Sequence, residues 1–185
     1  MAKVHDFNES LARSHQYEAA PWWRDVYKKA FPGLASMVTV RQDGWAQRGG
    51  IDRVLTLNSG RVVCVDEKVR EEDWPDILLE RWSDRDRKVP GWIQKSLACD
   101  YIAYAFAPSK RCYMLPFLDL RRAWRLNGEA WARVHRTVLA KNPSYVTESV
   151  AVPIPILMDA LSSSMCISWG EAGVGQQAQV LPEEK

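Results

Sequence analysis

The chain has 185 residues, a formal net charge of +2 and an apolar fraction of 46%. That length suits one domain with a sizeable core, and the balanced charge excludes a strongly basic nucleic-acid coat or an acidic solvating tail as a description of the whole chain. No apolar run is long enough to span a bilayer, and the first residues lack the apolar stretch of a secretory signal. We therefore expect a cytoplasmic protein with reduced thiols and no membrane partner.

Cysteine and histidine do not form a zinc-binding pattern. A structural zinc site needs four closely spaced Cys or His ligands, whereas these residues are scattered: Cys64, Cys99, Cys112, Cys166, His5, His15 and His135. We expect the cysteines to be buried as small hydrophobic side chains, and a Cys–His nucleophile pair stays open without a local pattern to support it. A bound metal would have carboxylate ligands, which favours magnesium or manganese.

The first half of the chain predicts two helices and then three strands. Apolar residues at helical spacing predict helices, β-branched runs predict strands, and Asn58-Ser59-Gly60 is a hairpin turn signal. Four successive apolar residues, Val62–Val65, indicate that the third strand is covered on both faces. The expected elements are helices at 6–20 and 22–31, strands at 34–41, 51–57 and 61–69, and a polar connection at 42–50.

The second half predicts a short helix, a second hairpin and a long helix. The charged segment 71–90 has no assigned element, and 143–155 is expected to loop over the surface because prolines interrupt it. Together the elements predict one α/β domain over 1–169, with a central mixed sheet of about five strands flanked by helices, and a disordered tail over 170–185. The elements expected here are a helix at 92–99, strands at 101–107 and 112–118, a helix at 119–139 capped by Asp119, and a short strand or helix at 154–161.

The first hairpin brings two acidic residues face to face. Asp52 lies seven residues before Ser59 and Asp66 lies seven residues after it, so they oppose each other in a hairpin without a bulge. Two carboxylates at about 4 Å repel by roughly 4 kcal/mol at an effective dielectric of about 20. Lys68 follows Asp66 by two residues and leaves the same face of the strand. We expect an acidic pocket with one ammonium group at its rim.

Such a pocket suits a hard divalent cation. Two carboxylates on rigid strands leave several positions of an octahedral ion for water and phosphate oxygen, and the ion lowers the pKa of water that it coordinates. The backbone carbonyl of Glu67 is a further candidate ligand, while its side chain should point to the opposite face. Lys68 would orient the attacking water or offset charge on phosphate. In the alternative interpretation, Asp52 and Asp66 are half-exposed charges at strand ends with Lys68 as their salt-bridge partner.

The sequence Gly50-Ile51-Asp52, followed after thirteen residues by Asp66-Glu67-Lys68, resembles the signature of the PD-(D/E)XK nuclease superfamily. The expected order of elements is also similar to the helix, three-strand meander, helix and further strand of that family. No proline precedes Asp52, where the namesake motif has one.

This resemblance implies a restriction-endonuclease-like core and Mg²⁺-dependent cleavage of nucleic acid, with Mn²⁺ as a substitute ion. The compact architecture without a recognition module is similar to that of small phage or mobile-element nucleases, by analogy alone. The resemblance implies catalytic roles for four residues, namely metal ligation by Asp52 and Asp66, contact with the attacking water by Lys68, and auxiliary ligation by Glu18 on the first helix.

Two further polar residues are candidates for the site. Glu80 follows an apolar stretch and either reaches the pocket as a further acid or is a solvated charge. Gln94, on the expected short helix, either contacts the site or lies on an exposed helix face.

Basic residues gather in two stretches that could neutralise phosphates, or that form solvated faces. Three tryptophans in the charged segment, Trp74, Trp82 and Trp92, either stack on bases or anchor the core or a dimer. The candidate nucleic-acid contacts are Arg81, Arg85, Lys88, Lys95, Arg121, Arg122 and Arg125.

The sequence thus predicts a metal-dependent nuclease acting on duplex or branched DNA, compatible with a homodimer. The rival is a catalytically inactive relative that binds nucleic acid or a protein partner. A third interpretation is a small interaction protein that uses exposed Trp and Arg side chains and binds no metal.

Overall fold

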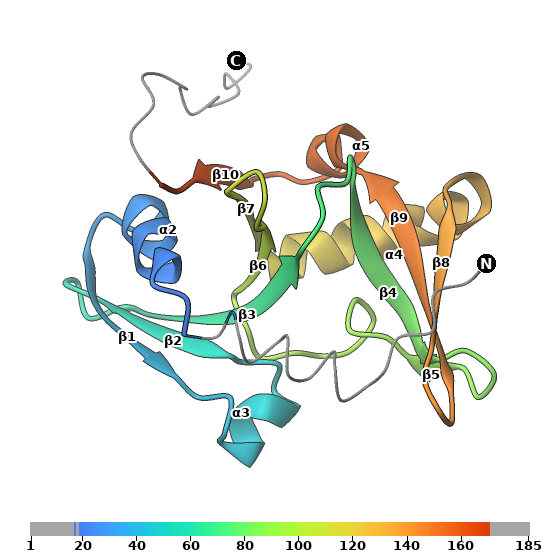
Figure 1. Ribbon diagram of the computed structural model, residues 1–185, viewed down its shortest axis with the longest axis horizontal. Helices are drawn as coiled ribbons and strands as arrows, with labels where there is room; N and C mark the ends of the chain where they lie inside the picture. Colours follow the sequence, from blue (N-terminus) through green and yellow to red (C-terminus); the bar gives the residue numbers. More distant parts are fainter. Residues whose placement is uncertain (1–16, 18, 171–185) are drawn as a thin grey trace.

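The computed structural model describes residue 17 and residues 19–170 (Figure 1). The helix expected at 6–20 falls almost wholly outside these residues, as does the expected tail beyond Gly170. Within the described part of the chain, no helix is both long enough and apolar enough to cross a membrane. The fold is mixed α/β, with a mixed sheet flanked by helices.

A six-stranded sheet carries the predicted hairpins, in the order β1-β2-β3-β6-β7-β10. Neighbouring strands are antiparallel except β3 and β6, which are parallel. The five expected strands are confirmed with small shifts at their ends, and only the four-residue β10 was not expected. The strands are β1 Leu34–Thr39, β2 Arg53–Leu57, β3 Val62–Arg70, β6 Tyr101–Phe106, β7 Arg111–Pro116 and β10 Met165–Ser168.

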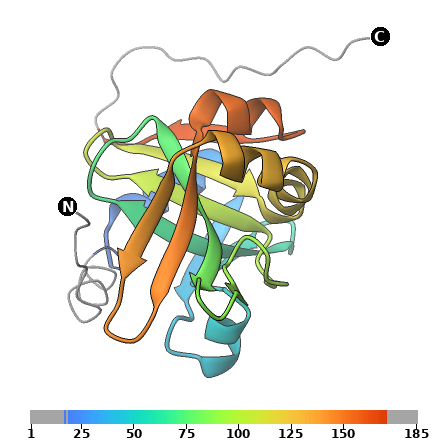
Figure 2. The same ribbon diagram turned by 90° about the vertical axis from the view of Figure 1, so that its right-hand side faces the viewer.

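A second, four-stranded sheet has the order β5-β4-β9-β8 and faces the viewer in Figure 2. This second sheet was not expected beside the predicted mixed sheet, and the expected loop at 143–155 was wrong. Apolar residues of β4 and β9 alternate and pair across the sheet, with Ile77 opposite Val152 and Leu79 opposite Val150, all fully buried. The strands are β4 Asp76–Asp84, β5 Val89–Pro90, β8 Thr137–Lys141 and β9 Val146–Pro153.

The helices are α2 Trp22–Ala30, α3 Gly44–Arg48, α4 Phe117–Val134 and α5 Ile154–Asp159. The helix expected at 22–31 and the helical option at 154–161 are confirmed, whereas α3 replaces part of an expected polar connection. The long helix ends at Val134, because the chain then turns into β8 and pairs with β9. Asp119 does not cap α4, since its carboxylate accepts the backbone N–H groups of Ser162 and Ser163.

The helix expected at 92–99 was wrong, because this segment is held by other elements. Gly91 lies so close to β4 that an added Cβ would stand 2.0 Å from the Glu80 carbonyl oxygen. The Gln94 side-chain amide donates to the Arg81 carbonyl, and the Ala98 N–H donates to the Gly49 carbonyl at 2.7 Å. The segment therefore forms turns along β4 in place of a helix.

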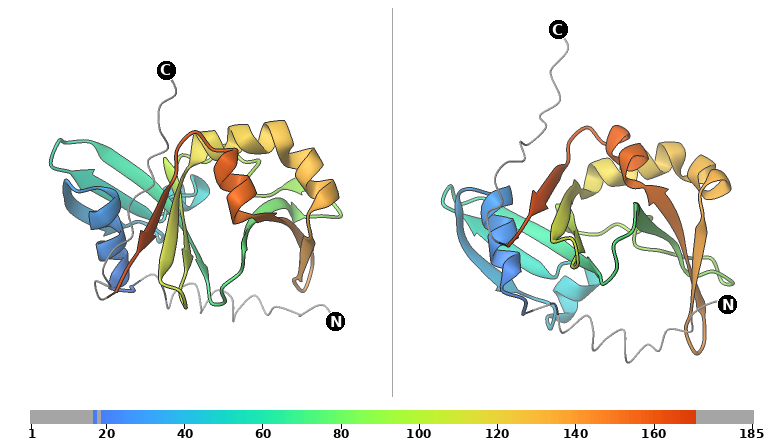
Figure 3. Two further views of the ribbon diagram at one scale, coloured as in Figure 1. Left: turned by 90° about the horizontal axis from the view of Figure 1, so that it is seen from above. Right: turned by 45° about the horizontal axis from the view of Figure 1, so that its top comes forward.

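Two hydrophobic cores lie on opposite faces of the six-stranded sheet. One packs beneath α2, and the other lies between the two sheets and against α4; Figure 3 shows α2 and α4 on opposite sides. Val63 and Val65 of β3 belong to the α2 core. The alternate residues Asp66 and Lys68 therefore face the second sheet. β3 is covered on both faces only over Val65–Glu67, because Val62 is exposed and Cys64 is half-buried. The motif lies where the two sheets meet.

Candidate functional site

The β2–β3 hairpin brings Asp52 and Asp66 together as its turn signal predicts. The register pairs Arg53 with Val65 as the last pair of the ladder, and Asp52 lies one residue before β2, at the level of Val65 and Asp66. The Asp52 N–H still donates to the Val65 carbonyl at 2.9 Å, while the Asp52 carboxylate accepts the Glu67 N–H at 2.7 Å. The Asp52 side chain thus continues the ladder and is fixed beside Asp66.

Lys68 lies directly against the second acid of the pair. Its Nζ donates to both carboxylate oxygens of Asp66 at 2.8 Å. The side chains of Lys68 and Asp66 are 30% and 7% exposed, and that of Asp52 is 20% exposed. The three groups are therefore gathered in a partly open position, where solvent reaches the ammonium more easily than Asp66.

The surroundings of Asp52 and Lys68 raise the pKa of both groups. Burial and the neighbouring Asp66 carboxylate raise the pKa of Asp52 from its ordinary value of 3.8 to about 6, although Arg41 lowers it. Burial lowers the pKa of Lys68, but Asp66, Asp52 and Glu80 outweigh it and hold that pKa above its ordinary value. Asp52 thus retains its proton more readily than an isolated carboxyl group, and the pair favours an added cation.

Glu67 points to the opposite face, as expected from strand alternation, and its side chain is fully buried. Its carboxylate accepts the Tyr27 hydroxyl from α2 at 2.6 Å and the Arg53 Nε at 2.8 Å. Burial and Glu67 raise the pKa of Tyr27 well above its ordinary value, so the phenol stays protonated and donates. The sequence analysis missed these partners; an acid in an apolar strand, with Arg53 diagonal to it on the neighbouring strand, was the available signal.

Arg41, beyond the end of β1, joins this buried network to the site. Its Nη2 lies 3.1 Å from Asp52 Oδ2 and 3.2 Å from Glu67 Oε2. The sequence analysis did not single out Arg41, since nothing local indicates that the chain after β1 returns to Asp52. Asp52 Oδ2 therefore receives two donors, Arg41 and the Glu67 N–H, which orients the carboxylate.

Glu80 of β4 and Trp92, just after β5, lie beside Lys68 and cover that side of the site. The Trp92 ring centroid lies 5.5 Å from Lys68 Nζ, and the Trp92 N–H donates to Glu80 Oε1 at 3.3 Å. Glu80 also acts on Lys68 through its charge, so it belongs to the surroundings of the site. Burial and Asp66 raise the pKa of the nearby Cys99 to about 12. Cys99 is consequently a protonated, buried thiol and no nucleophile.

The other cysteines and Gln94 differ from the sequence expectations. Cys112 is buried, but Cys64 is half-buried and Cys166 is exposed, so burial of all four was wrong. The Gln94 amide is bonded to the Arg81 carbonyl, which ties it to β4.

The predicted nucleic-acid contacts are divided between paired and exposed side chains. Arg81 pairs with Glu129 at 2.9 Å, Arg85 with Glu148 at 3.2 Å and Arg122 with Asp119 at 3.1 Å. Of the three tryptophans in the charged segment, Trp74 and Trp92 pack against the core between the sheets. The remaining candidates are Arg121, which lies over the Phe117 ring, and the exposed Lys88, Lys95 and Arg125.

Two carboxylates and one carbonyl are the available ligands for a divalent cation. Within residues 17 and 19–170, no group of three or more His, Cys, Asp or Glu side chains is arranged to hold a metal ion. The predicted auxiliary ligand Glu18 lies outside the described residues. Asp52 and Asp66 nevertheless offer hard carboxylate oxygens beside each other, and the charge of Asp66 acts on Asp52, which is donor chemistry that a hard cation accepts.

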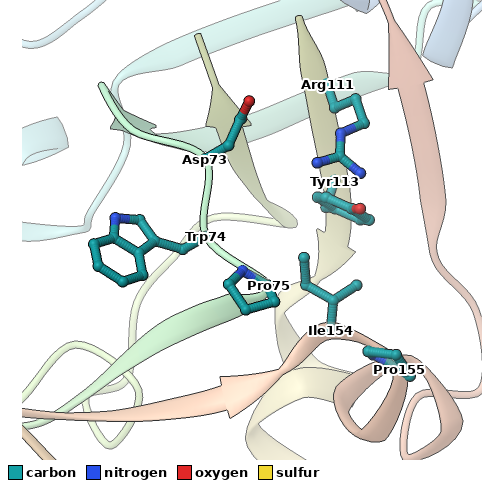
Figure 4. Close-up of a pocket in the computed structure, with 7 residues that line it drawn as sticks. All are labelled: Asp73, Trp74, Pro75, Arg111, Tyr113, Ile154 and Pro155. Atoms are coloured by element: carbon teal, nitrogen blue, oxygen red, sulfur yellow. The ribbon is translucent and has the colours of Figure 1, made fainter. Parts of the chain in front are cut away.

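A surface depression of about 420 Å³ lies away from this acid pair, between the β3–β4 connection, β7 and α5 (Figure 4). Its lining is mixed and contains no acid pair. The lining residues are Asp73, Trp74, Pro75, Arg111, Tyr113, Ile154 and Pro155.

Comparison of the chain with protein-family models, with curated proteins and with solved structures gave no match. The site geometry and the local motif therefore carry the functional interpretation.

Proposed function

We propose that this protein is a Mg²⁺-dependent nuclease of the PD-(D/E)XK type that hydrolyses phosphodiester bonds of DNA. The observation that carries the proposal is the cluster of Asp52, Asp66 and Lys68, in which Lys68 Nζ contacts both oxygens of Asp66 at 2.8 Å. Opposed acids with an adjoining ammonium are costly in a sheet unless they serve a cation or an anionic substrate.

Each residue has a distinct task in this proposal. Asp52, Asp66 and the Glu67 carbonyl would hold Mg²⁺, which supplies Lewis acidity toward water and phosphate when bound. Lys68, released from part of its contact with Asp66, orients the attacking water or offsets charge on the phosphate. Arg41 and the Glu67 N–H hold Asp52 Oδ2, so that Oδ1 is left for the cation. Asp66, Asp52 and Glu80 together keep Lys68 protonated.

The order α2, β1, β2, β3 and then a strand parallel to β3 supports a restriction-endonuclease-like core. One feature departs from the family pattern: the connection between β3 and β6 contains β4, β5 and turns, where the family has a helix. The proposal therefore rests on the cluster more than on the connection.

A second candidate is a relative that binds nucleic acid without cleaving it. Arg41 already lies 3.1 Å from Asp52, and Lys68 already pairs with Asp66. Both carboxylates thus have cationic partners within the chain, which favours a site that takes up no metal. This candidate predicts DNA binding, no Mn²⁺ binding and no cleavage.

The test is cleavage of labelled single-stranded, duplex and branched DNA, and of RNA, by the purified protein with Mg²⁺, Mn²⁺ or EDTA. Asp52→Asn and Lys68→Ala should each lower cleavage by about 100-fold or more while DNA binding is retained. Asp159→Asn, an exposed acid on α5, is the matched control. Isothermal titration with Mn²⁺ separates the two candidates. A wild-type protein that cleaves none of these substrates, whichever metal is added, would refute the nuclease.

A further inference from the structure

We propose that Trp45 and Arg48 on α3 form a stacking platform for an unpaired base of the DNA strand that enters the site. This inference rests on the proposed function and narrows its substrate to DNA with unpaired bases near the cut, as in single strands, flaps and branch points. Duplex DNA without such bases would not use the platform.

Trp45 is the clearest exposed aromatic residue of the described chain. Its side chain is 82% exposed, the highest value among the large exposed hydrophobic residues. Leaving an indole in water forgoes the stabilisation that its burial would give. An isolated exposed tryptophan therefore indicates a contact surface when its surroundings hold it in place.

Hydrogen bonds fix the backbone of α3 at Trp45. The Asp43 carboxylate caps α3 by accepting the Trp45 and Ala46 N–H groups at 2.8 and 3.1 Å. The Ala46 carbonyl accepts the Ile51 N–H at 2.9 Å. The helix is thus closed at both ends although it has only five residues.

Gly49, Gly50 and Ile51 connect α3 to Asp52. In Figure 1, α3 lies beyond the ends of β1 and β2, immediately before Asp52 in the chain. The Gly49 carbonyl accepts the Ala98 N–H at 2.7 Å, and Gly50, at φ +66°, packs against Leu97. The segment that carries Trp92 over Lys68 is therefore the one that braces α3.

The charge beside the indole fits a nucleotide. The Arg48 guanidinium lies over one face of the Trp45 ring, 5.6 Å from its centroid. A base would stack on the other face, and Arg48 could then serve the phosphate of that nucleotide. Every base offers a π-face, which makes such stacking tolerant of sequence. A base held in a duplex interior has both faces covered by its neighbours and cannot stack on Trp45 without leaving the helix.

The test is fluorescence anisotropy in EDTA with a labelled single-stranded oligonucleotide and with its duplex. Trp45→Ala should weaken single-strand binding about ten-fold or more and duplex binding less than about two-fold. Trp45→Phe should retain most of the affinity, because a phenyl ring still stacks. Arg48→Gln should reduce the salt slope of single-strand binding by about 0.7. Leu126→Ala, at an exposed apolar residue of α4, should change neither the affinity for the single strand nor the affinity for the duplex.

The outcomes separate this inference from the proposed function. Unchanged or equally weakened binding of both oligonucleotides by Trp45→Ala overturns the platform, even if the wild type cleaves DNA with Mg²⁺. Selective loss of single-strand binding supports the platform, even if no cleavage is found and the nuclease proposal fails. A wild-type dimer that Trp45→Ala dissociates would assign the indole to a subunit contact and also overturn the platform.

Discussion

Arg41 and Asp52 form an ion pair of 3.1 Å, and the nitrogen of Arg41 that makes it also lies 3.2 Å from Glu67. One guanidinium thus joins the candidate catalytic acid to a buried carboxylate behind the sheet. The position of Asp52 and the stability of the interior are therefore coupled.

Removal of the Arg41 charge should affect both ends of this link. Arg41→Gln should lower the free energy of unfolding by about 2 kcal/mol or more, because Glu67 loses one of its buried cationic partners. It should also make Mn²⁺ binding depend more steeply on pH near pH 6, because Arg41 lowers the pKa of Asp52 and its loss lets a proton compete more strongly for that carboxylate. Urea unfolding and calorimetric titration measure the two effects. Arg41→Lys should recover part of each, and equal losses in both variants would refute a role for the charge.

The buried hydroxyl of Tyr27 offers a separate test of the network on Glu67. Tyr27→Phe removes the 2.6 Å hydrogen bond without changing the ring packing. We expect a loss of about 1–3 kcal/mol in unfolding free energy, because the hydrogen bond has a charged acceptor. Tyr145→Phe, on a partly exposed residue between β8 and β9, is the control for loss of a phenol. A Tyr27→Phe protein as stable as the wild type would contradict the network.

Stability should depend on pH through Asp52. Its pKa is about 6 in the folded protein and 3.8 ordinarily, so between these values the folded state binds more protons than the unfolded state. The stabilising contribution is present below about pH 4 and is lost as pH rises through 6, by about 3 kcal/mol at most. Asp52→Asn should flatten this part of the curve in urea unfolding from pH 4 to 7, and an unchanged slope would count against the raised pKa.

Mn²⁺ should stabilise the protein more as the pH rises through the same range. The ion binds the ionised carboxylate and must displace a proton below about pH 6. We expect the increase in Tm at fixed Mn²⁺ to grow from pH 5 to pH 7 in the wild type and to be small throughout in Asp52→Asn. A wild-type Tm that does not respond to Mn²⁺ at pH 7 would favour the inactive relative.

Gly91→Ala should disturb the site from a distance. An added Cβ would meet the Glu80 carbonyl at 2.0 Å, which forces the Trp92 segment away from β4. We expect a loss of about 2 kcal/mol or more in unfolding free energy, together with weaker cleavage. Gly44→Ala is the matched control, because its Cβ would lie no closer than 4.0 Å to Arg48 and alanine favours a helix. Similar losses in both variants would show that the close approach is unimportant.

The β2–β3 hairpin was predictable because all its signals are local. The turn at Asn58-Ser59-Gly60 sets the pairing of β2 with β3, and counting outward from that turn places Asp52 near Asp66. Lys68 follows from the alternation as well. These residues needed no knowledge of the rest of the chain.

The second sheet and the buried network were not predictable in the same way. β4 and β9 begin about seventy residues apart in sequence, and prolines flank both. Each segment therefore resembles a loop when its partner strand is not known. Arg41 lies after the end of β1, where only the completed sheet shows what it contacts. Nothing local in the sequence indicates that Trp45 is exposed, because its exposure depends on how α3 folds back toward β2.

The parallel pairing of β3 with β6 sets an order for assembly. Antiparallel β2 and β3 can pair through a short turn. In contrast, β6 can pair with β3 only after the chain between β3 and β6 has crossed to the other layer. The nascent meander would therefore present its two repelling carboxylates to water before Glu80 and Trp92 arrive.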